Sequence, residues 1–243
     1  MRFDRILYLE PHAGRSSRTL PSARRIARDH GASLTVRWRR DEALRDALGE
    51  HDLVVTVAGR DTLRWPLRYA PAERELIHSC GCPVWVLHPA QSGPIRVVLA
   101  GVDVSREAEE ARAARVVRTA ARLAEGAGAE LHLVHAYSIT GESLIRSPGR
   151  GGSRGTLERA LRTEAAQRRA RLDRIVARER VHPVPEVVLR HGRTVAILEQ
   201  VAWERQADLV VVGAAPPRAR LGRLLFPPVA EQLLGRVHAS IAV

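Results

Sequence analysis

Three side chains that can bind a soft metal ion lie within one short segment of the chain: His78, Cys80 and Cys82. A structural zinc site usually needs four ligands, often supplied by two separated pairs, and no second cluster follows in this sequence. A cysteine can also act as a small apolar side chain where a helix leads into a buried strand. We therefore predict a structural role for this segment and no metal site.

His132 and His135 form an H-x-x-H pair inside the apolar segment ELHLVHAY. Side chains alternate between the two faces of a strand, so residues three apart point to opposite sides. We expect the two histidines to pack separately. The chain also lacks an H-E-x-x-H motif, a G-x-S-x-G elbow and any credible Ser/His/Asp or Cys/His arrangement. The sequence therefore predicts that the protein is not an enzyme and has no catalytic residues.

Arginine dominates the charge of the chain: 39 basic residues face 27 acidic ones, which gives a formal net charge of +12. Such a surplus can attract RNA or an anionic surface, and eight arginines lie in the expected helix 156–180. The complete absence of lysine indicates the codon bias of a GC-rich genome, and no aromatic stacking motif accompanies the arginines. We expect a solvated helix face and no specific nucleic-acid site. An RNA- or anionic-surface-binding module is the alternative, which the salt dependence of RNA binding would reveal.

Length and composition are typical of a globular protein. The chain has 243 residues, 45% of them hydrophobic, which is enough to bury a core in one large domain or two small ones. No run of about 18 apolar residues occurs, so we expect no insertion into a membrane. The first residues lack the features of a signal peptide, and the two cysteines form no disulfide framework. We therefore expect a cytoplasmic location.

The segments that would position these residues occur twice in the same order, as in a tandem repeat. A strand after a basic residue comes first, in RILYLE and RVVLAGVD. A helix rich in alanine and arginine follows and ends at a Gly-Ala pair, where Gly31 corresponds to Gly128. The third segment is HDLVVTVAG or ADLVVVGA, where Asp52 corresponds to Asp208. The fourth is AERELIHSCGCPVWVLH or AEQLLGRVHASIAV.

Short apolar strands that alternate with amphipathic helices indicate an α/β fold with parallel βαβ units. We predict two domains, residues 1–89 and 95–243, of which the first lacks one strand and one helix. In the first domain the expected strands are 5–9, 33–37, 53–57 and 84–87, and the expected helices are 22–30, 41–48 and 72–79. In the second domain the expected strands are 96–102, 130–135, 186–189, 209–212 and 238–243, and the expected helices are 107–125, 156–180, 195–205 and 229–234.

The order of these segments resembles the universal stress protein family. A βα domain that ends in ADLVVVG, a loop, a V-A-E-x-x-L helix and an apolar strand is similar to the domain of that family. IHSCGCPVWVLHP resembles the end of the first half of tandem members of the E type. The resemblance implies two Rossmann-like (adenine nucleotide α-hydrolase-like) halves, with strand order 3-2-1-4-5 in the second. It also implies that the halves pair through their last strands, 84–87 against 239–243.

Nucleotide-binding members of that family carry an acidic residue after the first strand and a glycine-rich loop after the fourth. By this resemblance, Asp103 would contact the ribose and Ala136 would pack against the adenine. Gly213 would be the first glycine of the loop, which ends at Val229. Asp103 has a second interpretation, as an acidic residue at a helix start with Ser105 as the N-cap.

The phosphate-binding part of this site looks degenerate. Glycines let backbone N–H groups approach a phosphate, whereas proline has no N–H to donate. Arg218, Arg220 and Arg223 could attract an anion but without a preformed cradle. The corresponding loop of the first domain, 59–69, has one glycine, and Glu10 stands near its acidic position. In the second domain four prolines occupy the loop: Pro216, Pro217, Pro227 and Pro228.

We therefore predict a stress-response protein without a cofactor, which binds an unknown protein partner or a small ligand between its helices and its sheet. The first alternative is a member that binds ATP or AMP with weak hydrolysis and uses Asp103 and Gly213 for this purpose. Homodimer formation is compatible with the sequence. Copurification of a nucleotide would separate the main prediction from this alternative.

Overall fold

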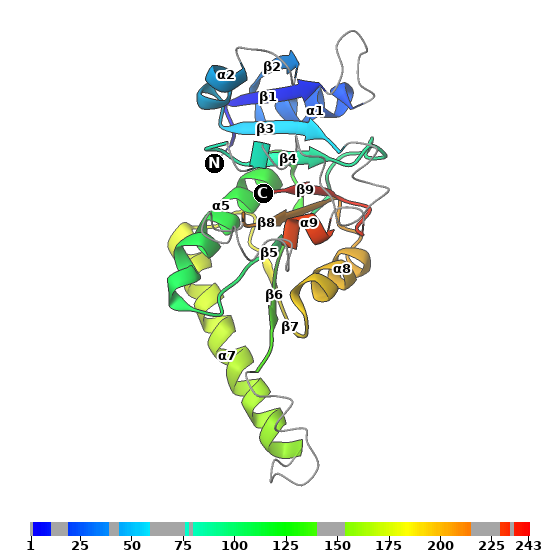
Figure 1. Ribbon diagram of the computed structural model, residues 1–243. Helices are drawn as coiled ribbons and strands as arrows, with labels where there is room; N and C mark the ends of the chain where they lie inside the picture. The colour runs from blue at the N-terminus through cyan, green and yellow to red at the C-terminus, as the bar shows by residue number, and fades with distance from the viewer. Residues whose placement is uncertain are drawn as a thin grey trace.

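In the part of the chain that the structure describes, nine β-strands form one mixed sheet with helices on both of its faces (Figure 1). The order of the strands across the sheet is β2-β1-β3-β4-β9-β8-β5-β6-β7. The computed structural model describes the following residues: 2–10, 19–38, 44–58, 76–77, 80–139, 154–214, 229–233 and 236–243.

The C-terminal part of the chain supplies five neighbouring strands in the order β7-β6-β5-β8-β9. Its first strand in the sequence lies in the centre, and all of its neighbouring strands are parallel. The predicted strand order 3-2-1-4-5 is therefore confirmed. The elements are β5 (Val97–Gly101), a short 3-10 helix η1 (Glu107–Glu109), α5 (Glu110–Ala127), β6 (Glu130–Tyr137), α7 (Arg154–Glu179), β7 (Glu186–His191), α8 (Thr194–Glu204), β8 (Leu209–Val212), α9 (Val229–Leu233) and β9 (Ser240–Ala242).

The N-terminal part adds four strands in the order β2-β1-β3-β4, again with parallel neighbours. Within the described residues this part has one strand fewer than the C-terminal part, as predicted. Of the expected helix 72–79, the structure describes 76 and 77 as helical. The elements are β1 (Arg5–Glu10), α1 (Leu20–His30), β2 (Ser33–Trp38), α2 (Leu44–Glu50), β3 (Leu53–Val57) and β4 (Val84–Leu87).

The two parts join where β4 pairs with β9 in the middle of the sheet. The pairing is antiparallel and places Val86 opposite Ile241. At the end of the ladder, Val84 and Val243 exchange two backbone hydrogen bonds of 3.0 Å each. The predicted pairing of the last strands is therefore confirmed. Because β4 is antiparallel to β9, the strands of the N-terminal part run opposite to those of the C-terminal part.

The two glycines matched in the sequence end equivalent helices in the same way. Gly31 follows α1 with φ 69°, and Gly128 follows α5 with φ 63°. Both lie in the left-handed region, which glycine adopts without a steric penalty. The N–H of each glycine lies within hydrogen-bonding reach of two carbonyls from the last turn of its helix. The sequence match at this position is therefore also a match of local geometry.

The two matched aspartates also make equivalent hydrogen bonds. The carboxylate of Asp52 accepts hydrogen bonds from the backbone N–H groups of Asp4 and Arg5, each 3.0 Å long. The carboxylate of Asp208 accepts them from Arg96 and Val97, at 2.8 and 3.1 Å. Each aspartate thereby fixes the start of a central strand, so the repeat extends from sequence to hydrogen bonding.

Each face of the sheet carries one apolar core that runs through both parts of the chain. Alternation along the strands sends neighbouring residues to opposite faces: Ile6 and Tyr8 of β1 lie in the core under α1, α5 and α7, whereas Leu7 and Leu9 lie in the core under α2, α8 and α9. Since both cores cross the β4–β9 junction, the two parts are held together by shared burial as well as by the strand pairing.

Helix α5 meets the N-terminal part at a closely packed contact. The guanidinium of Arg122 lies 3.8 Å from the centre of the Phe3 ring and forms a 3.1 Å ion pair with Asp52. His30, which is 4% exposed, packs over Gly126. Burial, together with the positive charge of Arg122, lowers the pKa of His30 to about 4. The imidazole is therefore neutral at neutral pH.

Among the helices of the described ranges, none combines the length and the apolarity required to cross a membrane.

Candidate functional site

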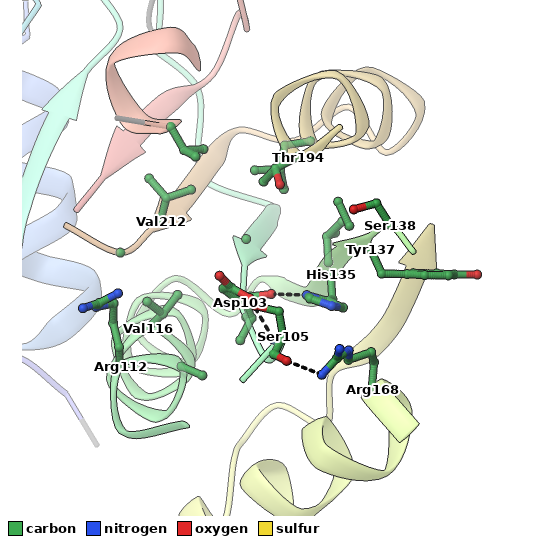
Figure 2. Close-up of a pocket in the computed structure, with 18 of the residues that line it drawn as sticks. Asp103, Ser105, Arg112, Val116, His135, Tyr137, Ser138, Arg168, Thr194 and Val212 are labelled. Atoms are coloured by element: carbon green, nitrogen blue, oxygen red, sulfur yellow. Dashed lines mark hydrogen bonds between the residues drawn. The ribbon is translucent and has the colours of Figure 1, made fainter. Parts of the chain in front are cut away.

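A pocket of about 490 Å³ opens at the carboxyl ends of the central strands of the C-terminal part (Figure 2). After β5 the chain passes to α5 on one face of the sheet, and after β8 it continues to α9 on the other face. Open α/β sheets bind ligands at such a topological switch point. The volume is within the range of pockets that hold one small molecule.

The four residues proposed from the sequence all line this pocket. Asp103 follows β5, Ala136 lies in β6, Gly213 follows β8 and Val229 begins α9. The structure thus brings together four positions that are far apart in the chain. The prolines and arginines of the loop between Gly213 and Val229 lie outside the described residues, as does the loop 59–69.

Asp103 is held by the turn that follows β5. Its Oδ1 accepts a 2.9 Å hydrogen bond from the backbone N–H of Ser105. Burial raises the pKa of the carboxyl group, but hydrogen bonds from Ser105 and the charges of His135 and Arg168 outweigh it, so the pKa is below its usual value. Asp103 is therefore ionised at neutral pH. The second interpretation, with Ser105 as an N-cap, is wrong, because Arg106 holds that position before η1 and the backbone N–H of Ser105 donates to Asp103 instead.

His135 lies in the lining of the same pocket and carries a buried hydrogen-bond acceptor (Figure 2). Its Nδ1 lies 2.8 Å from the carbonyl oxygen of Val102. A carbonyl only accepts hydrogen bonds, so Nδ1 carries the proton. Burial lowers the pKa of the ring, so Nε2 holds a lone pair at neutral pH. The side chain is 2% exposed, and within the described part of the chain Nε2 has no hydrogen-bond partner.

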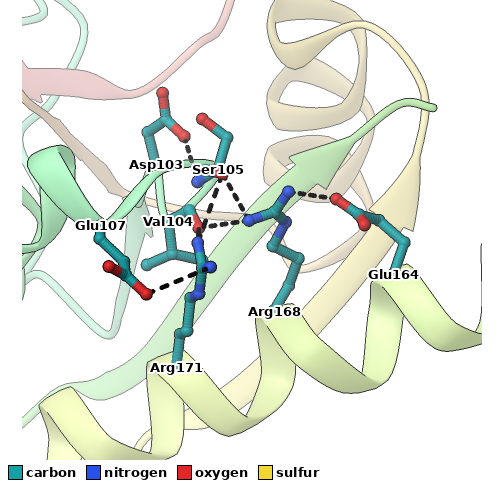
Figure 3. A network of polar contacts seen from close by, with 7 residues as sticks. All are labelled: Asp103, Val104, Ser105, Glu107, Glu164, Arg168 and Arg171. Carbon is teal, nitrogen blue, oxygen red and sulfur yellow. Dashed lines mark hydrogen bonds and ion pairs between the residues drawn. The ribbon is translucent and has the colours of Figure 1, made fainter. Parts of the chain in front are cut away.

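Two arginines of α7 fasten the loop that carries Asp103 (Figure 3). Arg168 donates to the carbonyl oxygens of Val104 and Ser105 and pairs with Glu164. Arg171 donates to the carbonyl of Val104 at 3.1 Å. The two side chains are only 13% and 20% exposed. The expectation of a uniformly solvated face on this helix is therefore wrong at these two positions.

The rest of the described lining is mainly apolar, and its cations are already engaged. Arg112 pairs with Glu109, and Arg168 pairs with Glu164. Such pairs leave little free positive charge for a ligand. Ser105, Ser138 and Thr194 contribute hydroxyl groups to the lining, and the apolar side chains are Val102, Ala113, Val116, Val134, Leu198, Val212 and Ala214.

Gly101 and Gly213 allow the helices to approach the pocket floor closely. A Cβ atom on Gly101 would lie 2.9 Å from Leu198 Cδ1, and one on Gly213 would lie 3.2 Å from Val116 Cγ2. Packing against α8 and α5 therefore explains why glycine occupies these two positions. A contact with a phosphate is not required to explain Gly213.

Sequence reasoning missed His135 and Arg168 as pocket residues. His135 lies one position before Ala136, near the carboxyl end of a strand, and this position was the available signal. As predicted, His132 lies apart from it: its imidazole is 3.3 Å from Glu186 and 3.6 Å from Glu130. No group of three or more metal-ligating side chains occurs within the described ranges, and His78 lies outside them.

The sheet order and the pocket at its switch point define a Rossmann-like α/β protein. The sequence pattern of the universal stress protein family matches residues 94–243, which is more than half of the chain. The chain belongs to the universal stress protein family. A comparison with curated protein sequences finds no match.

Two solved structures share the fold over almost the entire chain. A functionally unknown protein from Pseudomonas aeruginosa PAO1 has a TM-score of 0.64 and 17% identity, covering 99% of this chain and 92% of its own. A universal stress protein from Archaeoglobus fulgidus has a TM-score of 0.55 and 15% identity, covering 99% and 87%. At such identities the similarity concerns the fold alone.

Proposed function

We propose that this protein is a non-enzymatic stress-response protein that binds a small, uncharged ligand with several hydrogen-bond donors, such as a nucleoside, in the pocket around Asp103. The observation that carries the proposal is a pair of acceptors in the pocket lining, the ionised Asp103 carboxylate and the buried His135 Nε2, which has no partner in the described part of the chain. A ribose diol or an exocyclic amine would supply the donors that these atoms need.

The proposal excludes ATP as the physiological ligand, and no cofactor is required. The described lining holds the anionic Asp103 and Glu164 beside Arg112 and Arg168, and both arginines are engaged in ion pairs. A triphosphate would have to bind without a free cation from these residues. The four prolines after Gly213 also remove backbone donors, and each lost charge-assisted hydrogen bond costs about 1.5–3 kcal/mol.

Calorimetry with adenosine and with Mg²⁺-ATP tests this function. We expect adenosine to bind at least tenfold more tightly than ATP. Asp103→Asn should weaken adenosine binding about 10- to 100-fold, because the hydrogen bond loses its charge. Asp173→Asn is the matched control, since Asp173 lies exposed on α7 in an ion pair with Arg169. ATP binding that equals or exceeds adenosine binding, or no adenosine binding at all, would contradict the proposal.

The positioning role of Arg168 gives a second expected result. Arg168→Met should lower adenosine affinity about tenfold, since the loop that holds Asp103 keeps the hydrogen bond from Arg171 but loses those from Arg168, and Glu164 loses its partner. Arg169→Met removes only an exposed ion pair of the same helix and should change little. The adenosine affinities should be measured well below the melting temperature of each variant. Equal adenosine affinities of the two variants would show that the hydrogen bonds from Arg168 to the loop are not required for binding.

We also propose that the chain is a cytoplasmic tandem member of its family, similar to the E type, with domains at 1–89 and 95–243. The family pattern matches only the second segment. The equivalent glycine caps and aspartate bonds of both parts support a common origin. The inward direction of Arg168 and Arg171 makes the basic helix a weaker candidate for RNA binding, and an unknown protein partner remains part of the proposal.

A further inference from the structure

The two cysteines of the chain lie next to each other outside the pocket. The backbone N–H of Cys80 donates to the carbonyl of Leu76 at 2.9 Å. Cys82 stands before Pro83, whose carbonyl accepts a 3.0 Å hydrogen bond from Val54 of β3. Both side chains are half-buried and pack against the core under α2, α8 and α9. The two thiols are hydrogen-bonded to each other.

The chain itself holds these thiols within bonding reach. Residues two apart are separated by at most about 7 Å between Cα atoms, and a disulfide needs about 4.4–6.8 Å. Gly81 leaves the turn between them room to adjust, since a Cβ atom at this position would meet no heavy atom within 4 Å. The geometry therefore suits bond formation within one chain.

The surroundings give the two sulfur atoms different reactivity. The hydrogen bond from Cys80 favours the thiolate of Cys82 and, with backbone hydrogen bonds, lowers its pKa against the opposing effect of burial and of Asp52. The same hydrogen bond, together with burial, raises the pKa of Cys80. Since the thiolate is the nucleophile, Cys82 is the attacking residue and Cys80 the resolving one.

We propose that Cys80 and Cys82 form a peroxide-reactive dithiol site that closes reversibly to an intramolecular disulfide. The Cys82 thiolate attacks one oxygen of hydrogen peroxide; an S–O bond forms, the O–O bond breaks, and the hydroxide that leaves takes a proton to become water. Cys82 is then a sulfenic acid. The Cys80 sulfur attacks it and loses its proton, the S–S bond forms, and the hydroxyl group leaves as a second water. Two thiols are oxidised and one peroxide is reduced.

Peptide mass spectrometry of the full chain tests this site. The chain has no lysine, so trypsin releases both cysteines in one peptide, residues 75–96, after Arg74 and Arg96. After peroxide treatment and alkylation with N-ethylmaleimide, we expect this peptide to carry no alkyl group. Its mass should be two hydrogen atoms below that of the same peptide with two free thiols. Dithiothreitol should restore alkylation at both cysteines. Oxidised protein that forms crosslinked dimers, or that keeps two alkylatable thiols, would overturn the proposal.

Two variants separate the roles of the cysteines. In Cys80→Ser the resolving thiol is missing, so a sulfenic acid should accumulate at Cys82 and be captured by dimedone. In Cys82→Ser the remaining Cys80 should react with peroxide at least tenfold more slowly than Cys82 reacts in Cys80→Ser. The wild-type protein in urea provides a comparison that needs no variant, and its disulfide should form about tenfold more slowly than in the folded protein at the same pH. Equal rates in the two variants, or equal rates with and without urea, would show that the folded site confers no reactivity.

Discussion

Cutting the chain after Pro94 is expected to give two fragments that are insoluble or self-associated. The cut separates β4 from β9 and exposes two strand edges that would pair with other chains. It also divides both apolar cores, which hold residues of both parts. Trp85, which is 1% exposed in the intact chain, would lose part of its cover. Burial of each large apolar side chain is worth about 1.5–3 kcal/mol, so the loss of several approaches the whole stability of a domain.

Coexpression of the two fragments is the control for this experiment. If the loss of the shared sheet and cores is the cause, fragments 1–94 and 95–243 should form a soluble complex of one copy each. Size-exclusion chromatography with light scattering measures this composition. Two soluble, monomeric fragments obtained separately would show that the β4–β9 junction is not required by either part.

Gly126→Ala is expected to destabilise the protein by about 2 kcal/mol, although alanine is the better helix former by about 1 kcal/mol. The new Cβ would lie 2.0 Å from His30 Cε1. The imidazole is too buried to move aside freely, and overpacking of this kind costs about 1–3 kcal/mol or more. A displaced ring would also lose its contact with Phe3, whose ring centre is 5.2 Å away. Thermal unfolding should show a melting temperature about 4–8 °C lower.

Gly49→Ala in α2 is the matched control for this substitution. A Cβ atom there would have no heavy atom within 4 Å, so only the helix propensity changes. We expect the melting temperature to be unchanged or slightly raised. The free energy of unfolding should rise by at most about 1 kcal/mol. Equal shifts in the two variants would mean that the contact between α1 and α5 contributes little to stability.

The arrangement of the sheet could be predicted from the sequence because its signals are local and repeated. Apolar strands, glycine caps and the matched aspartates recur in order, and βαβ units leave few topologies. The ends of elements were less predictable: His238 was expected in the last strand, but β9 begins at Ser240. Strand ends depend on where hydrogen-bonded neighbours stop, which periodicity does not record.

The pocket was predictable in its backbone positions but not in its polar contacts. Asp103 and Gly213 follow central strands, and that position alone marks a switch point. Arg168 was unpredictable because the spacing of α7 shows which residues share a side, not that a loop from 64 residues earlier packs there. His135 looked like a packing residue, since strand alternation assigns it a face without revealing a cavity on that face.

The antiparallel ladder between β4 and β9 resembles an association that usually requires two molecules. Two residue pairs define its register, Trp85 opposite Ala242 and Val86 opposite Ile241. The short segment between β4 and β5 connects the two parts of the chain that the ladder joins. Tethering turns such an encounter into an intramolecular step, with an effective concentration in the millimolar range for a short linker. Dilution therefore leaves the ladder intact, where the same surfaces on separate chains would have to overcome the loss of translational freedom. Within the described residues, the N-terminal part has one strand fewer than the C-terminal part and still remains paired with it.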